Sequence, residues 1–129
     1  MLLKMKILAL DLGAKKTGFA IAQEGFVFGR GIACGWNHLD ELAGTIKGII
    51  NIDKIDKIIA GVPQSQSGDA AEKVRKIISD LQELIILEIE EVDETLTSKA
   101  AQSRISGNGK YDDDEEAAKI LLEDYLRKN

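Results

Sequence analysis

The sequence predicts an α/β fold built on one mixed five-stranded sheet, with three antiparallel strands followed by two parallel strands and helices on both faces. Residues 6–12 form a nearly continuous apolar run that ends at Gly13, which is typical of a strand buried on both faces. Two further strand patterns meet at Glu24-Gly25, a two-residue hairpin signal. In the second half, strand patterns alternate with helix patterns, which favours parallel pairing through right-handed crossovers.

The individual elements follow from the spacing of apolar residues. Behind Trp36, apolar side chains recur at helical spacing, and Asn37 is a suitable N-cap. The last predicted strand alternates apolar with acidic side chains, so we expect it at a sheet edge. The predicted strands are residues 6–12, 17–23, 26–34, 55–62 and 86–92, and the predicted helices are residues 39–50, 71–84, 97–105 and 114–126.

Size and charge limit the classes of protein that fit. A chain of 129 residues with 44% apolar residues and one proline is expected to form a single domain over residues 1–129. We find no low-complexity linker and no repeat at a solenoid period. The net charge of -5 and the pI near 4.9 argue against a protein that coats nucleic acid through a basic surface.

Cysteine use and the N-terminal segment predict a cytoplasmic protein without a membrane span. Cys34 is the only cysteine, so a disulfide framework and a zinc cluster are excluded, and we expect a small buried hydrophobe there. The apolar part of residues 1–10 is too short for a membrane span and lacks a cleavage site for a signal peptide. His38 is expected at the surface of a helix start, and Trp36 either packs at its rim or stacks on a base.

Acidic residues stand at three positions that attract attention. Asp11 ends the first buried strand, where an unpaired carboxylate would be costly without a cation or hydrogen-bond donors. Glu94 follows the strand at residues 86–92, and ligands of open α/β sheets bind outside strand ends. The third position is the acidic run 112–116, which includes Asp114 and of which only one residue need do chemistry. The alanines at 117–118 predict that this helix packs closely on its neighbour, which would hold its first turn against the sheet.

Each position also has a simpler explanation. Asp11 could cap the turn before Gly13, Glu94 could help to start a helix, and the run 112–116 could be a solvated helix start. Taken together, the three acids favour one mechanism, in which carboxylates hold Mg²⁺ or Mn²⁺ against a phosphate during phosphodiester hydrolysis. Whether Asp112 or Asp113 takes the place of Asp114 stays open.

These residues resemble the YqgF (RuvX) family of the RNase H-like superfamily. Its members are described as Holliday junction resolvases and are linked to maturation of the small-subunit ribosomal RNA precursor. The resemblance covers essentially the whole chain and implies an RNase H-like fold and a metal-dependent endonuclease. The matching stretches are ILALDLGAKKTG from Ile7, DKIIAGVP from Asp56, VDETLTS from Val92 and DEEAAKILLEDYL from Asp114.

The resemblance also implies roles for particular residues. The catalytic carboxylates that would bind Mg²⁺ or Mn²⁺ are Asp11, Glu94 and Asp114. Residues expected to contact nucleic acid, either precursor ribosomal RNA or branched DNA, are Lys15, Lys16 and Thr97.

Two departures from the family pattern bear on substrate affinity. Thr95 stands where family members usually carry an arginine, and the connection between Ser98 and Asp114 is short and poor in basic residues. Both favour a nuclease of modest affinity or one that requires a partner. Two other classes stay open, a nucleotide-binding module with an Asp-x-Gly phosphate motif and a non-catalytic protein-interaction module. The sequence does not distinguish a monomer from a homodimer.

Overall fold

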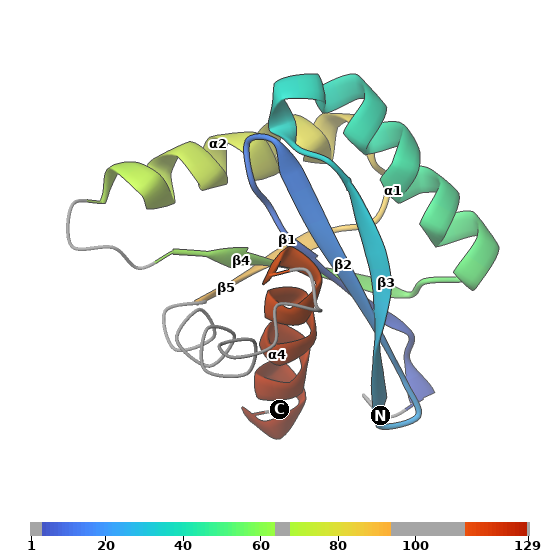
Figure 1. The fold of residues 1–129 in the computed structure, drawn as a ribbon. Helices are drawn as coiled ribbons and strands as arrows, with labels where there is room; N and C mark the ends of the chain where they lie inside the picture. Colours follow the sequence, from blue (N-terminus) through green and yellow to red (C-terminus); the bar gives the residue numbers. More distant parts are fainter. Residues whose placement is uncertain (1–3, 64–67, 94–112, 129) are drawn as a thin grey trace.

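The computed structural model describes residues 4–63, 68–93 and 113–128, whose strands form one mixed sheet (Figure 1). The strands are β1 (Ile7–Asp11), β2 (Lys16–Gln23), β3 (Phe26–Cys34), β4 (Lys57–Val62) and β5 (Ile89–Asp93). They form a 5-stranded sheet in the order β3-β2-β1-β4-β5. β1, β2 and β3 pair antiparallel, whereas β4 runs parallel to both β1 and β5. The predicted sheet is therefore confirmed, including the edge position of the last strand.

Helices cover both faces of the sheet, as predicted. A short 3-10 turn at Trp36–His38 leads into α1 (Leu39–Asp53), and α2 (Asp69–Leu84) follows β4. These two helices lie on one face of the sheet, and α4 (Asp113–Lys128) lies on the other (Figure 1). None of the described helices is both long and apolar enough to cross a lipid bilayer.

Strand alternation divides the core into two layers. Leu8 and Leu10 face α1 and α2, whereas Ile7 and Ala9 face α4, because successive side chains of a strand point to opposite faces. The layer under α4 is rich in alanine, which lets the helix approach the sheet closely. Its fully buried leucines each contribute about 1.5–3 kcal/mol. The buried members of this layer are Ile7, Ala9, Ala20, Ala22, Ile59, Ala118, Leu121, Leu122 and Tyr125.

The hairpin between β2 and β3 has the predicted geometry. Glu24 and Gly25 have φ values of 52° and 86°, as a two-residue turn with left-handed backbone at both positions requires. Further along β3, the pairing with β2 shifts between Phe19 and Ala20, whose partners are Gly31 and Gly29. Arg30 is the extra residue of this β-bulge.

Several predicted boundaries differ from the structure by one to three residues, and hydrogen bonds between segments or across a turn account for two of the differences. The N-cap of α1 is His38 rather than Asn37, whose backbone N–H instead donates to the carbonyl of Ala14. The last strand begins at Ile89 rather than at residue 86. There the Gln82 side chain bonds the carbonyl of Leu87 at 2.8 Å and the N–H of Ile89 at 2.8 Å, which holds the preceding residues in a turn.

The C-terminal half of α4 is tied to the parallel part of the sheet. The Tyr125 hydroxyl donates to Glu90 Oε1 at 3.1 Å, and Lys57 Nζ lies 2.7 Å from the same oxygen. Hydrogen bonds with Glu90 and Tyr125 raise the pKa of Lys57, so its ammonium stays charged. This cluster fixes the far end of α4 on β4 and β5. The predicted helix at residues 97–105 lies outside the described residues, as does most of the predicted loop at residues 64–68.

Candidate functional site

Asp11 is the last residue of β1 and lies on the face of the sheet that α4 covers. It continues the alternation of Ile7 and Ala9, both of which belong to the core under α4. Unlike those two residues, Asp11 is only half-buried, and its neighbour across the antiparallel pair is Gly18 on β2. The Asp11 carboxylate therefore lies at the edge of the apolar core, at the end of the sheet where β1 ends.

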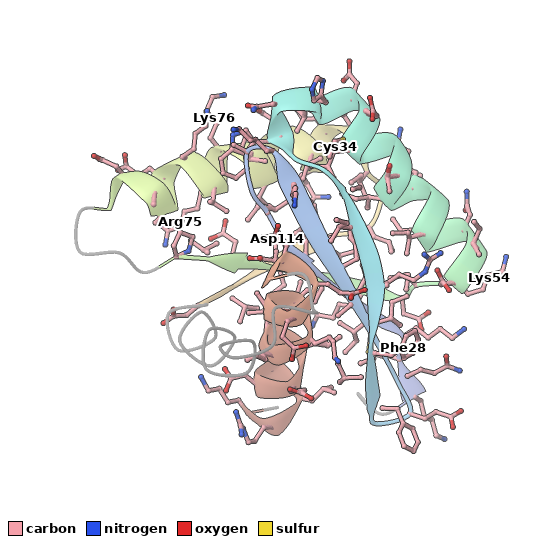
Figure 2. All side chains as sticks on the ribbon, viewed as in Figure 1. Phe28, Cys34, Lys54, Arg75, Lys76 and Asp114 are labelled. Atoms are coloured by element: carbon pink, nitrogen blue, oxygen red, sulfur yellow. The ribbon has the colours of Figure 1, made fainter. Side chains whose placement is uncertain are left out.

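The first turn of α4 is packed directly on the neighbour of Asp11. A Cβ atom built on Gly18 would overlap the carbonyl group of Asp114 and would lie 2.6 Å from the backbone nitrogen of Glu115. Because directly opposed residues of an antiparallel pair have Cα atoms roughly 5 Å apart, the backbone of Asp114 lies beside the end of β1. Figure 2 shows Asp114 at the end of α4 that lies against the sheet. The fold thus brings Asp11 and Asp114 together from opposite ends of the chain.

The third predicted carboxylate, Glu94, and the predicted contact residue Thr97 lie outside the described residues. The last described residue before them is Asp93, an exposed residue that ends β5 and pairs with Val62. Over residues 4–63, 68–93 and 113–128, no three His, Cys, Asp or Glu side chains converge to hold a metal. The convergence of the full predicted set therefore stays a prediction.

Lys15, in the turn between β1 and β2, and Lys16, the first residue of β2, are exposed at the same end of the sheet as Asp11. The turn is held by backbone hydrogen bonds from the segment that precedes α1. The N–H of Gly35 donates to Lys15 at 2.9 Å, and that of Trp36 donates to Gly13 at 3.0 Å. Gly35 has no room for a side chain, because a Cβ there would overlap the backbone of Gly13. Two positive charges are thus presented from a fixed turn, as a phosphate contact requires.

The described part of the acidic run 112–116 forms the first turn of α4 and is not simply a solvated helix start. The Glu115 carboxylate accepts a hydrogen bond from the N–H of Gly31 at 2.6 Å, a charge-assisted contact worth about 1.5–3 kcal/mol. Glu116 is 7% exposed, and its carboxylate lies 3.7 Å from Lys119 Nζ. Neither role is predicted by the sequence pattern. The available signal was the pair of glycines in β3: Gly29 leaves space for the Glu115 carboxyl group, and Gly31 donates its backbone N–H to it.

Other residues singled out in the sequence have structural roles. Cys34 is half-buried against the α1 side of the core rather than fully buried. Desolvation and the nearby Glu41 carboxylate raise the pKa of its thiol, so it is a poor nucleophile. His38 is exposed at the start of α1, as predicted, and Trp36 packs against the core.

A groove of about 320 Å³ lies on the opposite face, between the ends of α1 and α2. Its lining contains no carboxylate, so it is unsuited to a metal centre. The lining residues are Lys47, Ile50, Asn51, Leu84, Ile85, Ile86 and Leu87.

Comparison with known proteins links this arrangement to nucleases. Residues 5–128 match the family model described as "RuvX: Holliday junction resolvase". A protein of Maridesulfovibrio salexigens named "Putative pre-16S rRNA nuclease" is 31% identical over an alignment of 136 residues. The alignment covers 95% of this chain and 98% of the relative.

Solved structures of junction resolvases share the fold. The fowlpox virus Holliday junction resolvase aligns with a TM-score of 0.59 and 15% identity, covering 97% of this chain and 100% of the viral protein. Thermus thermophilus RuvC in complex with a Holliday junction substrate aligns with a TM-score of 0.58 and 7% identity, covering 97% and 96%. These similarities confirm the predicted RNase H-like fold.

Replacement of Gly18 by alanine should displace the first turn of α4. We expect Gly18→Ala to lower the free energy of unfolding by about 1–3 kcal/mol, because the methyl group would overlap the Asp114 carbonyl. Gly44→Ala is the matched control. A Cβ at Gly44 meets nothing within 4 Å, and alanine there should stabilise α1 by about 0.5–1 kcal/mol. Urea unfolding measures both, and wild-type stability in Gly18→Ala would contradict the close approach.

Proposed function

The chain belongs to the RuvX family of Holliday junction resolvases, and we propose that it is a metal-dependent endonuclease whose divalent ions are held by Asp11, Glu94 and Asp114. The chain is a nuclease that acts in ribosomal RNA maturation or in junction resolution. Metal dependence, the identity of the ligands and the choice between these substrates are part of the proposal. It also treats residues 1–129 as one nuclease domain that works in the cytoplasm, as a monomer or a homodimer.

One observation carries the proposal. The start of α4 rests on Gly18, the strand partner of Asp11, so that two of the three candidate carboxylates belong to neighbouring backbone segments. Carboxylate oxygens are hard ligands that suit Mg²⁺ and Mn²⁺. A half-buried carboxylate at the rim of an apolar core can reach a cation while water stays excluded on its other side. The donor set therefore fits the metal that the family implies.

Each part of the site has a separate task in this proposal. When bound, a pair of divalent ions lowers the pKa of water and stabilises both the attacking and the leaving oxygen of an in-line displacement. In this proposal Asp11 and Asp114 would supply two of the ligand carboxylates. Glu94, which follows β5 in the sequence, would supply the third. Lys15 and Lys16 would contact phosphates of the nucleic-acid backbone, and Thr97 would add a hydrogen bond to the nucleic acid.

The substrate that we favour is precursor ribosomal RNA. The relative from Maridesulfovibrio salexigens carries that substrate in its name and is similar over nearly its whole length. The net charge of -5 and the threonine at position 95 leave few basic groups for tight binding of a duplex. Modest affinity suits an enzyme that meets its substrate in a larger ribonucleoprotein, and cleavage of branched DNA is the alternative outcome of the test.

Cleavage assays with an Asp11→Asn variant test the catalytic assignment. In Mg²⁺ or Mn²⁺, we expect the wild type to cut a precursor 16S ribosomal RNA fragment, with a four-way DNA junction and a linear duplex as comparisons. Removal of one ligand charge should lower the rate by at least about a hundredfold. Asp40→Asn, which changes an exposed carboxylate at the start of α1, should cut normally. Equal rates for Asp11→Asn and wild type would assign the cleavage to another site or to a contaminant.

Metal should also stabilise the folded protein without any nucleic acid. Carboxylates gathered at one site repel one another until a cation binds. Mn²⁺ at about 100 times its dissociation constant should therefore stabilise the wild type by about 2.7 kcal/mol. Thermal unfolding with and without Mn²⁺ measures the effect, and Asp11→Asn should show little of it. The metal site is refuted if excess Mg²⁺ and Mn²⁺ leave the melting temperature of the wild type unchanged.

Lys15 and Lys16, at the end of the β1–β2 turn and the start of β2, should determine part of the salt dependence of binding. Each of Lys15→Ala and Lys16→Ala should reduce the slope of log K against log salt by about 1, with similar losses for all sequences, because each removes one phosphate contact. Lys47→Ala changes an exposed lysine on the opposite face of the sheet and serves as control. Fluorescence anisotropy over a salt series measures the slopes. If a variant has the same slope as the Lys47→Ala control, the substituted lysine does not contact the substrate backbone.

A further inference from the structure

Glu115 makes an unusual contact for a residue in an acidic run at a helix start. Its Oε2 atom accepts a hydrogen bond from the backbone N–H of Gly31 on β3 at 2.6 Å. A Cβ built on Gly29 would lie 2.6 Å from the same oxygen and 2.5 Å from the carboxyl carbon. The carboxyl group therefore occupies the space that the missing side chain of Gly29 leaves open.

The β-bulge of β3 lies directly beside this space, which we call the carboxylate seat at Gly29 and Gly31. The pairing of β2 with β3 skips Arg30, and a bulge takes the extra residue out of the ladder and bends its strand. Gly31 has a φ of +94°, a left-handed backbone conformation that suits glycine. The bulge is fastened from both faces of the sheet. Arg30 Nε donates to Asp53 at the end of α1 at 2.9 Å, while Gly31 donates to Glu115 on α4.

Glu115 is placed away from the proposed metal ligands. It contacts β3, whereas Asp11 lies on β1, and two strand spacings separate these strands by about 10 Å. Consecutive helical residues point about 100° apart, so the side chains of Asp114 and Glu115 leave α4 in different directions. A direct role of Glu115 as a ligand beside Asp11 does not fit this arrangement.

We infer that Glu115 is a positioning residue for the nuclease site. Its carboxylate anchors the first turn of α4 to the bulge of β3, and this anchor holds the preceding residue, Asp114, over Gly18 beside Asp11. The inference rests on the proposed function, because it assumes that Asp11 and Asp114 bind metal. Without the anchor, the first turn of α4 is free to lift from the sheet, and the two carboxylates lose their common geometry.

Three variants separate this role from general stability. Glu115→Ala removes the acceptor, Glu115→Gln keeps an oxygen that can accept the Gly31 N–H, and Gly29→Ala fills the seat without removing the charge. Leu126→Ala is the matched control. It weakens the packing of α4 about 16 Å away along the helix and touches no part of the site.

Mn²⁺ binding without nucleic acid, measured by calorimetry, is the main readout. We expect Glu115→Ala and Gly29→Ala to weaken binding by about tenfold or more, as for residues that orient metal ligands. Glu115→Gln should recover most of the affinity. In cleavage assays, the loss should appear as a higher Mn²⁺ requirement at an unchanged KM for nucleic acid. Hydrogen exchange of the Gly31 amide should speed up in Glu115→Ala and stay slow in Leu126→Ala.

Several results would overturn the inference. It is wrong if Glu115→Ala binds Mn²⁺ like the wild type, if Leu126→Ala loses affinity equally, if Glu115→Gln behaves like alanine, or if Gly31 exchange is unchanged. Failure of the proposed function has a different signature, because Asp11→Asn would then bind Mn²⁺ and cut nucleic acid as the wild type does. Normal behaviour of Glu115→Ala beside an inactive Asp11→Asn refutes the anchor alone.

Discussion

The close contact between the first turn of α4 and the glycines of the antiparallel strands determines the rest of the candidate site. At Gly18 and Gly29 the strands offer no side chain, so helix atoms lie directly against the sheet. The alanines of the layer beneath, among them Ala20 and Ala118, allow the same close approach further along the helix. A methyl group at Gly18 would overlap the backbone of the helix, and one at Gly29 would displace the Glu115 carboxyl group. Because metal ligands tolerate displacements of only about 0.5 Å, the proposed metal site would depend on this contact.

The same packing helps to reconcile an acidic chain with a nucleic-acid substrate. Several carboxylates form hydrogen bonds or ion pairs with other groups of the protein and are therefore not free negative charges on its surface. Glu115 bonds β3, Glu90 pairs with Lys57, and Asp53 pairs with Arg30. The exposed lysines at positions 15 and 16 meanwhile lie at the end of the sheet where Asp11 is found. Charge distribution, rather than net charge, decides whether a phosphate can approach.

Fold similarity and family membership support different statements. The junction resolvases of fowlpox virus and Thermus thermophilus share the fold at identities of 15% and 7%, and similarity at that level leaves the substrate undetermined. The family match over residues 5–128 connects the chain with nucleases along its whole length. That Thr95 and the acidic composition weaken the binding of phosphate stays a prediction.

By itself, the sequence determined the strands, their mixed order, the hairpin at Glu24-Gly25 and the position of Asp11 at a strand end, because these follow from local periodicity and turn chemistry. The functional roles of the predicted site residues stay predictions; these residues are Asp11, Lys15, Lys16, Glu94, Thr97 and Asp114. Three features depend on tertiary contacts: α1 is capped at His38, β5 starts at Ile89, and the Glu115 carboxylate bonds the backbone of β3 instead of facing solvent. Each of these depends on a hydrogen bond to another part of the fold, and such partners leave no periodic signal in the segment itself.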